Sequence, residues 1–268
     1  MTTAIRDHAR VLRYASMSAI ADFRAIYTWR TWTFAWLIRI LCQVSLFALL
    51  GRLLGSPGKT SFLLIGNCVF MVANTATQVI SSTAWERMAG TLPLLVASPT
   101  APFWVFTGRS VQWLLDGLSC STVSLFLLAP LFDVPLPMPS ALLAVPIMAL
   151  TAVSTYCFAL VLAALVLRML SLRSLVSSLS GLTLMVLTGV QVPISFWPTP
   201  VRQLAEVLPL THGLQAVRDL LAGDALVRIG GQAAIEAAIG VGWLLVAALA
   251  FRRFAEHGRH DGSIEFGA

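Results

Sequence analysis

Few residues of this chain have the type and spacing that catalysis, metal binding or phosphate binding requires. His257 and His260 have the H-x-x-H spacing of a metal-binding pair, but no cysteine or carboxylate pattern completes a zinc site, so we expect a solvated tail. Residues 58–60 (GKT) resemble the end of a phosphate-binding loop, yet Leu53 stands where the pattern G-x-x-x-x-G-K-[ST] requires glycine. No G-x-S-x-G, H-E-x-x-H or glycine-rich dinucleotide-binding pattern occurs. We therefore expect no catalytic residue and no metal ligand.

Arg39 and Asp116 are opposite charges inside apolar stretches. A charge in hydrocarbon is costly unless it finds a partner. Arg39 lies about seven residues into its stretch and Asp116 about twelve, so at ~1.5 Å per residue their depths differ by only about 8 Å. The sequence predicts a structural ion pair between them. A proton relay is the alternative, although a relay usually needs more than one titrating group.

Amide and hydroxyl side chains recur at helical spacing in two other apolar stretches, 62–83 and 175–192. Polar groups in a bilayer must face protein or water. Each set therefore either bonds neighbouring helices or lines a path for a substrate. The candidate path-lining residues are Asn67, Asn74, Gln78, Ser81, Ser177, Thr188 and Gln191.

The elements that must hold these residues are membrane helices. The 268 residues are 57% hydrophobic and 11% charged, against ~25% charged in a typical soluble domain, and the mean hydropathy is +0.83. The net charge of +6 raises the possibility of a nucleic-acid partner. The basic residues lie at the edges of apolar segments, as expected for contact with lipid headgroups, so we expect membrane lipids and no nucleic acid as partners.

Six stretches are long enough to cross the ~30 Å hydrocarbon layer, and we predict one all-α transmembrane domain over residues 1–268. The predicted spans are 32–54, 62–83, 104–132, 141–167, 175–192 and 233–251. Residues 1–30 have an apolar face with basic flanks, which predicts an interfacial amphipathic helix, with a solvated tail as the alternative. Residues 193–229 are too interrupted by proline to span, which predicts a re-entrant or surface hairpin with short helices at 201–208 and 214–221. Residues 252–268 form a polar tail.

The distribution of Lys and Arg predicts the orientation of these spans. Twelve such residues fall on the side of both termini and five on the other side. Because basic residues are enriched on the cytoplasmic side, both termini are predicted to be cytoplasmic and the 193–229 hairpin extracytoplasmic.

The same count places a short charged segment, 85–99, in the cytoplasm between the second and third spans. Glu86 and Arg87 are adjacent charges at a helix end, Gly90 permits a change of direction, and Leu92 and Leu95 contribute to an apolar face. Such a segment is either a contact for a cytoplasmic partner or a simple loop, and the residues alone leave both open.

Two motifs favour the partner contact. Residues 86–92 (ERMAGTL) resemble the E-R-x-x-G-T-L segment of the type-two family of ATP-binding-cassette (ABC) exporter permeases. In that family a proline-rich extracytoplasmic hairpin precedes a Leu-Pro-Leu-Thr-like segment, and residues 192–198 (VPISFWP) and 208–218 (LPLTHGLQAVR) are similar to this pattern. The motifs occur in the family's order, and the resemblance covers nearly the whole chain.

The resemblance implies a half-transporter. Such a subunit pairs with a second permease, identical or paralogous, and with two separate ATPase subunits that bind ATP and Mg, so no cofactor is expected in this chain. Residues 84–98 would form a coupling helix in a groove of the ATPase, and the second and fifth spans would line the path. The implied contact residues are Glu86, Arg87, Gly90, Thr91, Leu92 and Leu95. Pro93 departs from the family, which commonly has a charged or polar residue there.

The implied function is export of an amphipathic drug-like or lipid molecule from a bacterial cell through its inner membrane. Export of a lipid-linked polysaccharide is the alternative within the family. A membrane-embedded lipid-modifying enzyme is the alternative from another class, but it requires polar or metal-binding groups clustered at one interface, which the sequence lacks. A secondary transporter requires helices broken at the midplane, whereas the breaks predicted here lie near the outer face.

Overall fold

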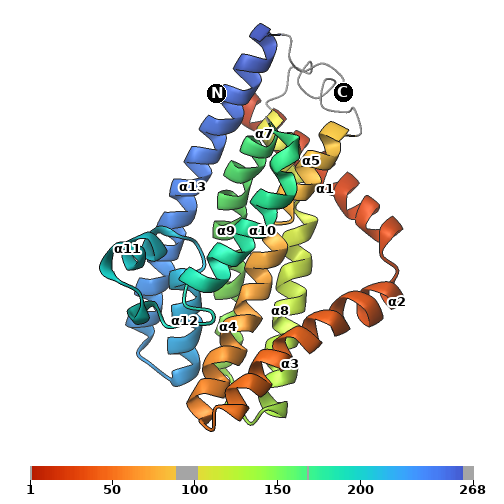
Figure 1. The fold of residues 1–268 in the computed structure, drawn as a ribbon. Coiled ribbons are helices and arrows are strands. Elements are labelled where there is room, and N and C mark those ends of the chain that lie inside the picture. Colours follow the sequence, from red (N-terminus) through yellow and green to blue (C-terminus); the bar gives the residue numbers. More distant parts are fainter. Residues whose placement is uncertain (1, 89–101, 168, 262–268) are drawn as a thin grey trace.

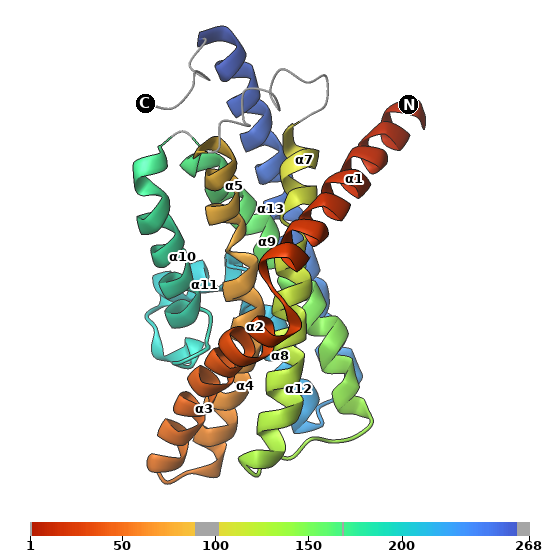
Figure 2. The same ribbon diagram turned by 90° about the vertical axis from the view of Figure 1, so that its right-hand side faces the viewer.

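The computed structural model describes residues 2–88, 102–167 and 169–261, and within these ranges the chain is helical, with no strand. A single bundle is formed, with the long helix α13 along one side and α1 leaning away from it (Figures 1 and 2). The elements are α1 (Thr2–Ile26), α2 (Trp29–Thr31), η1 (Trp32–Leu37), α3 (Ile38–Leu53), α4 (Pro57–Ala76), α5 (Val79–Met88), α7 (Pro102–Arg109), α8 (Gln112–Leu131), η2 (Ser140–Leu143), α9 (Ala144–Val166), η3 (Leu170–Leu172), α10 (Arg173–Leu187), η4 (Ile194–Phe196), α11 (Thr199–Val207), α12 (Thr211–Ala222) and α13 (Leu226–Asp261).

Helix α4 lies at the centre of the bundle and packs against α3, α8, α9 and α12. Every residue from Leu64 to Ala73 is buried, as expected for a helix that is apolar on all sides. Ser121 of α8 donates a hydrogen bond to the carbonyl of Cys68 in α4, which joins the two helices at their contact. The core is thus built around the second predicted span.

Among the described residues, five helical stretches are long and apolar enough to cross a membrane: Trp29–Leu53, Pro57–Thr83, Phe103–Leu131, Ser140–Val166 and Leu226–Arg253. They correspond to the first, second, third, fourth and sixth predicted spans. The prediction of an all-α polytopic membrane protein is confirmed.

The fifth predicted span, 175–192, is shorter than expected. Helix α10 ends at Leu187 and has 15 residues, so its length of about 22 Å is less than the ~30 Å of the hydrocarbon layer. The helix stops because Gly189 has a φ of 88°, a left-handed conformation that glycine adopts without strain. Apolar composition alone extended the predicted helix past this point.

The third predicted span is interrupted at residues 110–111, between α7 and α8. The hydroxyl of Ser110 bonds the carbonyl of Phe106 and also lies 2.6 Å from the hydroxyl of Tyr156 in α9. Tyr156 also donates to the carbonyl of Thr107 at 2.8 Å. This buried cluster fixes the junction of α7 and α8 against α9.

Helix α1 covers most of the predicted amphipathic segment and ends at Ile26, before a break at residues 27–28. It packs closely on α7, because a Cβ atom at Gly108 would lie 2.5 Å from the Cβ of Ala15. An ion pair between Asp22 and Arg109, at 3.6 Å, joins the same two helices. The helix is as predicted, and its position at the membrane interface stays a prediction.

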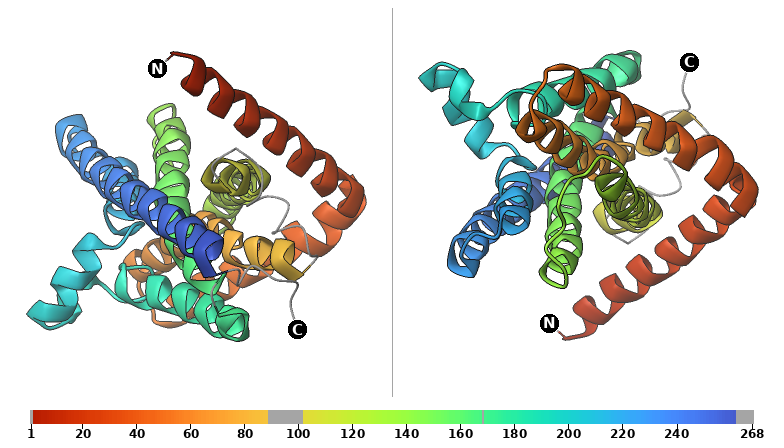
Figure 3. Two further views of the ribbon diagram at one scale, coloured as in Figure 1. Left: turned by 90° about the horizontal axis from the view of Figure 1, so that it is seen from above. Right: turned by 90° about the horizontal axis from the view of Figure 1, so that it is seen from below.

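The start of α1, the end of α13 and the end of α5 lie at one end of the bundle, and the α3–α4 and α12–α13 turns lie at the other (Figure 1). The views along the bundle show α13 crossing beside α9 and α12 (Figure 3). Helix α13 has 36 residues and continues to Asp261. The first ten residues of the predicted polar tail, 252–261, are therefore helical.

The predicted hairpin, 193–229, contains two helices close to those expected, α11 and α12. Helix α12 is not a surface helix, however, because Leu214, Val217 and Leu220 are buried and the helix packs against α4, α9 and α13. The apolar face of this short amphipathic helix is turned into the bundle.

Candidate functional site

The predicted ATPase contact lies at the end of α5. Helix α5 follows a break at residues 77–78, where the hydroxyl of Thr77 bonds the carbonyl of Asn74, and it packs against α9 and α10. The backbone places Glu86 and Arg87 in its last turn. The other predicted contact residues, Gly90, Thr91, Leu92 and Leu95, lie outside the described residues.

The two predicted polar faces meet each other, since α10 packs against α4 and α5. The side-chain amide of Gln191 donates a hydrogen bond to Asn67 Oδ1 at 3.2 Å. Asn67 is fully buried and donates through Nδ2 to the carbonyl of Leu63 at 2.8 Å. Its hydrogen bonds are therefore made inside one subunit, as expected for a packing contact between helices.

The other candidate path-lining residues fall into two groups. Thr188 is buried and bonds the carbonyl of Leu184 in the preceding turn. Asn74 is half-buried opposite Gly181, where an added Cβ would lie 3.6 Å from Asn74 Oδ1. The remaining half-buried residues are Gln78, Ser81, Ser177 and Gln191. In this conformation Asn67 and Thr188 are interior residues, and a role in a path stays a prediction for the half-buried ones.

The predicted ion pair between Arg39 and Asp116 is not formed. Trp32 Nε1 donates to Asp116 Oδ1 at 2.6 Å and Trp36 Nε1 donates to Oδ2 at 2.9 Å. The Arg39 guanidinium lies 4.6 Å from the centre of the Trp36 ring instead. Arg39 and Asp116 lie at depths that would allow a pair, but their side chains do not point towards each other. The π-helical turn η1 directs the indoles of Trp32 and Trp36 towards α8, where they bind Asp116 instead.

A second buried carboxylate, Glu236 of α13, is a residue that the sequence reasoning missed. Its two oxygens accept backbone N–H groups at the start of α12, from Leu210 at 2.9 Å and Gly213 at 3.0 Å. The first N–H groups of a helix have no partner within it, and its N-terminus favours negative charge. A single acidic residue in an apolar stretch is the signal that could have identified it, as it did for Asp116.

This carboxylate holds a strained backbone. Leu210 has a φ of 84°, and such a conformation costs a non-glycine residue about 1–3 kcal/mol. Glu236 accepts the N–H of that residue. The contact therefore fixes the start of α12 against α13.

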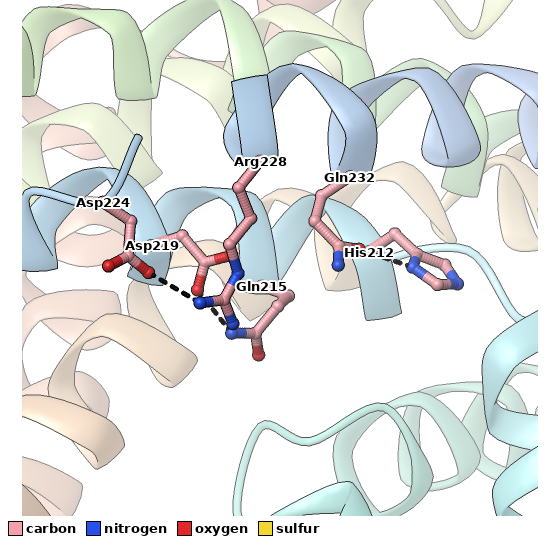
Figure 4. A network of polar contacts seen from close by, with 6 residues as sticks. All are labelled: His212, Gln215, Asp219, Asp224, Arg228 and Gln232. Carbon is pink, nitrogen blue, oxygen red and sulfur yellow. Dashed lines mark hydrogen bonds and ion pairs between the residues drawn. The ribbon is translucent and has the colours of Figure 1, made fainter. Parts of the chain in front are cut away.

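A polar network along the outer side of α12 and α13 extends this contact (Figure 4). Arg228 lies 3.2 Å from the carboxylates of both Asp219 and Asp224, and Gln215 donates to Asp219 at 2.6 Å. Nearer the start of α12, His212 Nδ1 lies 2.8 Å from the side-chain oxygen of Gln232. These contacts join the two helices on either side of the Gly223 turn.

Arg218 is directed into the bundle from the same helix. It donates to the carbonyl of Phe62 at 3.1 Å and lies 3.7 Å from the centre of the Phe62 ring. Burial lowers the pKa of the Arg218 guanidinium to about 9, which leaves it protonated at neutral pH. Its Nε has no hydrogen-bond partner, so the charge is held by a carbonyl and a ring.

These polar groups position helices, and in the described ranges they form no assembled nucleophile and base and no group of three metal-binding side chains. The fold and the site thus define a polytopic helical membrane protein with internal polar contacts.

Comparison with known proteins gives the family. The family model described as ABC-2 type transporter matches residues 16–222, which is more than half of the chain. The chain therefore belongs to the ABC-2 type transporter family and is a membrane permease of an ABC transporter. A search of curated proteins gives no match.

Proposed function

We propose that this permease exports an amphipathic drug-like or lipid molecule from the cytoplasm or the inner leaflet, powered by separate ATPase subunits. The match to the ABC-2 type transporter family carries the proposal, because it includes both motifs, 86–92 and 208–218. Amides and hydroxyls beside an apolar surface suit a large amphipathic molecule better than an ion, since none of the candidate path-lining residues is charged.

The proposed energy input is through residues 84–98, acting as a coupling helix in a groove of the ATPase. Glu86 and Arg87 are in the last turn of α5, and α5 packs on α9 and α10. A push on this end of α5 would be passed to the helices that carry the candidate path. A second permease subunit, identical or paralogous, would complete the path.

The test is coupled transport by the full chain with the ABC ATPase that copurifies with it from its native membrane. Glu86→Ala and Arg87→Ala are expected to lower substrate-stimulated ATP hydrolysis by about tenfold, a typical size for coupling between two sites, while the permease remains folded. Arg202→Ala and Glu206→Ala are the matched controls, since they remove a base and an acid that form an exposed i,i+4 ion pair on α11. Wild-type activity in both coupling variants would reject the coupling assignment.

The substrate is tested separately, by transport of a panel of amphipathic compounds and lipids into inside-out vesicles. Asn74→Leu and Gln78→Leu are expected to change the preference among substrates more than the binding of the ATPase. An unchanged substrate profile would show that both residues are packing contacts. An exporter should take compounds up into inverted vesicles when ATP is added. ATP-dependent release of preloaded compounds from these vesicles, without uptake, would contradict the exporter direction.

A further inference from the structure

A cavity of about 310 Å³ lies beside the bend that joins α1 to α2. It is open on one side and is lined by the end of α1, the bend itself, the start of the Trp29–Leu53 span and one face of α8. Figure 2 shows these elements side by side. Most of the lining is apolar or aromatic, with Phe23, Tyr27, Trp29 and Trp32 on one side. Nothing in the proposed transport function uses this cavity.

Asp116 lines the cavity as an acidic side chain for which the described part of the chain provides no Arg or Lys partner within 4 Å. The residue is 5% exposed, and its oxygens accept from neutral groups, the indole N–H groups of Trp32 and Trp36 and the thiol of Cys120. Arg39, the nearest candidate partner by sequence, lies over the Trp36 ring instead. Buried charges in membrane proteins are normally paired, so this carboxylate calls for a positive group from outside the chain.

Gln112 lines the same cavity. The side-chain oxygen of Gln112 is buried and has no hydrogen-bond partner. An unmatched buried acceptor is unfavourable, and a ligand with N–H groups would satisfy it. A protonated primary amine offers three donors and one positive charge, which suits both Asp116 and Gln112.

The aromatic lining supports the same ligand. An ammonium group is attracted to the faces of Trp and Tyr rings, and Tyr27, Trp29 and Trp32 all line the cavity. Arg24 lies on the cavity wall as well, and the structure describes no ion pair or hydrogen bond for it. The cavity thus presents one negative and one positive side chain, which matches a zwitterion.

The position of the cavity selects the kind of zwitterion. It lies where the Trp29–Leu53 span begins and beside the first two turns of α8, which starts at Gln112. Tryptophans line it, and tryptophan is typical of the boundary between headgroups and hydrocarbon. Leu115 and Ser119 of α8 line its outer part and are exposed, so acyl chains can leave along this helix. We propose that the cavity holds the headgroup of an aminophospholipid, with the ammonium at Asp116 and Gln112 and the phosphate at Arg24.

The test uses the full chain in nanodiscs of equimolar phosphatidylethanolamine, phosphatidylcholine and phosphatidylglycerol, followed by transfer to mild detergent and mass measurement of the retained lipid. The wild-type chain is expected to retain phosphatidylethanolamine over the other two. Asp116→Asn is expected to lower retention about tenfold, the effect of losing one charge-assisted hydrogen bond. Asp133→Asn, which changes an exposed acid at the other end of α8, is expected to leave retention unchanged.

Ser119→Trp is a second variant, because it fills the cavity without removing a partner of Asp116. Loss of retention in a chain that elutes as the wild type in gel filtration supports the proposal even where Asp116→Asn fails to fold. Equal retention of the three lipids, or unchanged retention in both cavity variants, would overturn it. Because no ATPase is present, these outcomes do not depend on the proposed transport function.

Discussion

Two buried carboxylates of the bundle, Glu236 and Asp116, are held in different ways. Glu236 is fully buried, and both of its oxygens accept backbone N–H groups of one helix terminus. Asp116 is nearly as buried, but it accepts two side-chain indoles and lines a cavity. Neither has an Arg or Lys partner within 4 Å in the part of the chain that the structure describes.

The different partners of the two carboxylates indicate a structural role for Glu236 and a binding role for Asp116. The N-terminus of α12 supplies both donors and a favourable dipole, so the charge of Glu236 is compensated inside the protein. Indole groups supply donors without positive charge. The Glu236 contact is therefore complete, whereas Asp116 still favours a cation, and substitutions at the two sites should have different consequences.

The largest effect is expected for Glu236→Leu. It leaves the N–H groups of Leu210 and Gly213 buried without an acceptor, which should cost about 3 kcal/mol of stability. The measurement is the thermal unfolding midpoint of the full chain in detergent. Glu206→Leu, at an exposed position of α11, is the control. Equal midpoints for the two variants would show that Glu236 does not hold α12.

A smaller loss of stability, about 1–2 kcal/mol in the free energy of unfolding, is expected for Asp116→Leu. The two indoles lose their acceptor, but both are half-buried and can reorient, and Trp32 lines the cavity. The same thermal midpoint is measured, together with a shift in tryptophan emission. A loss larger than that of Glu236→Leu would remove the proposed distinction between the two carboxylates.

Arg228→Ala is expected to lower the free energy of unfolding by about 1 kcal/mol. It removes the positive partner of Asp219, which is 5% exposed, but the arginine side chain is itself 60% exposed and Gln215 still bonds the carboxylate. The thermal midpoint is compared with that of Arg228→Lys, which keeps the charge. Identical losses in the two variants would show that geometry, and not charge, stabilises the network.

The smallest effect is expected for Arg202→Ala, which removes the ion pair with Glu206 at 3.6 Å on α11. Both side chains are about half exposed, and such i,i+4 pairs contribute about 0.3–0.5 kcal/mol. The thermal midpoint should match the wild type within error. A clear decrease would mean that α11 is held by charge, unlike the buried contacts of α12.

Some of the candidate site could be predicted from sequence because helical periodicity is local. The spacing of Asn67, Asn74 and Gln78 placed them on one face, and that face meets α10 in the structure. Periodicity could not say whether such a face is closed by a neighbour. The hydrogen bond from Gln191 to Asn67 depends on two residues 124 positions apart, which no local pattern contains.

Apolar length by itself determined the all-helical membrane fold and five of the spans, because a bilayer demands about 20 helical apolar residues wherever it is crossed. The motifs determined the family. Only the tertiary structure decided the short α10, since one left-handed glycine outweighs apolar composition. It also decided the partners of the buried charges. The depth of a residue in the bundle follows from its position in the sequence, but the neighbour that its side chain faces depends on how the helices pack. Asp116 therefore lies against two indoles and an aromatic cavity, and Glu236 lies against the start of α12.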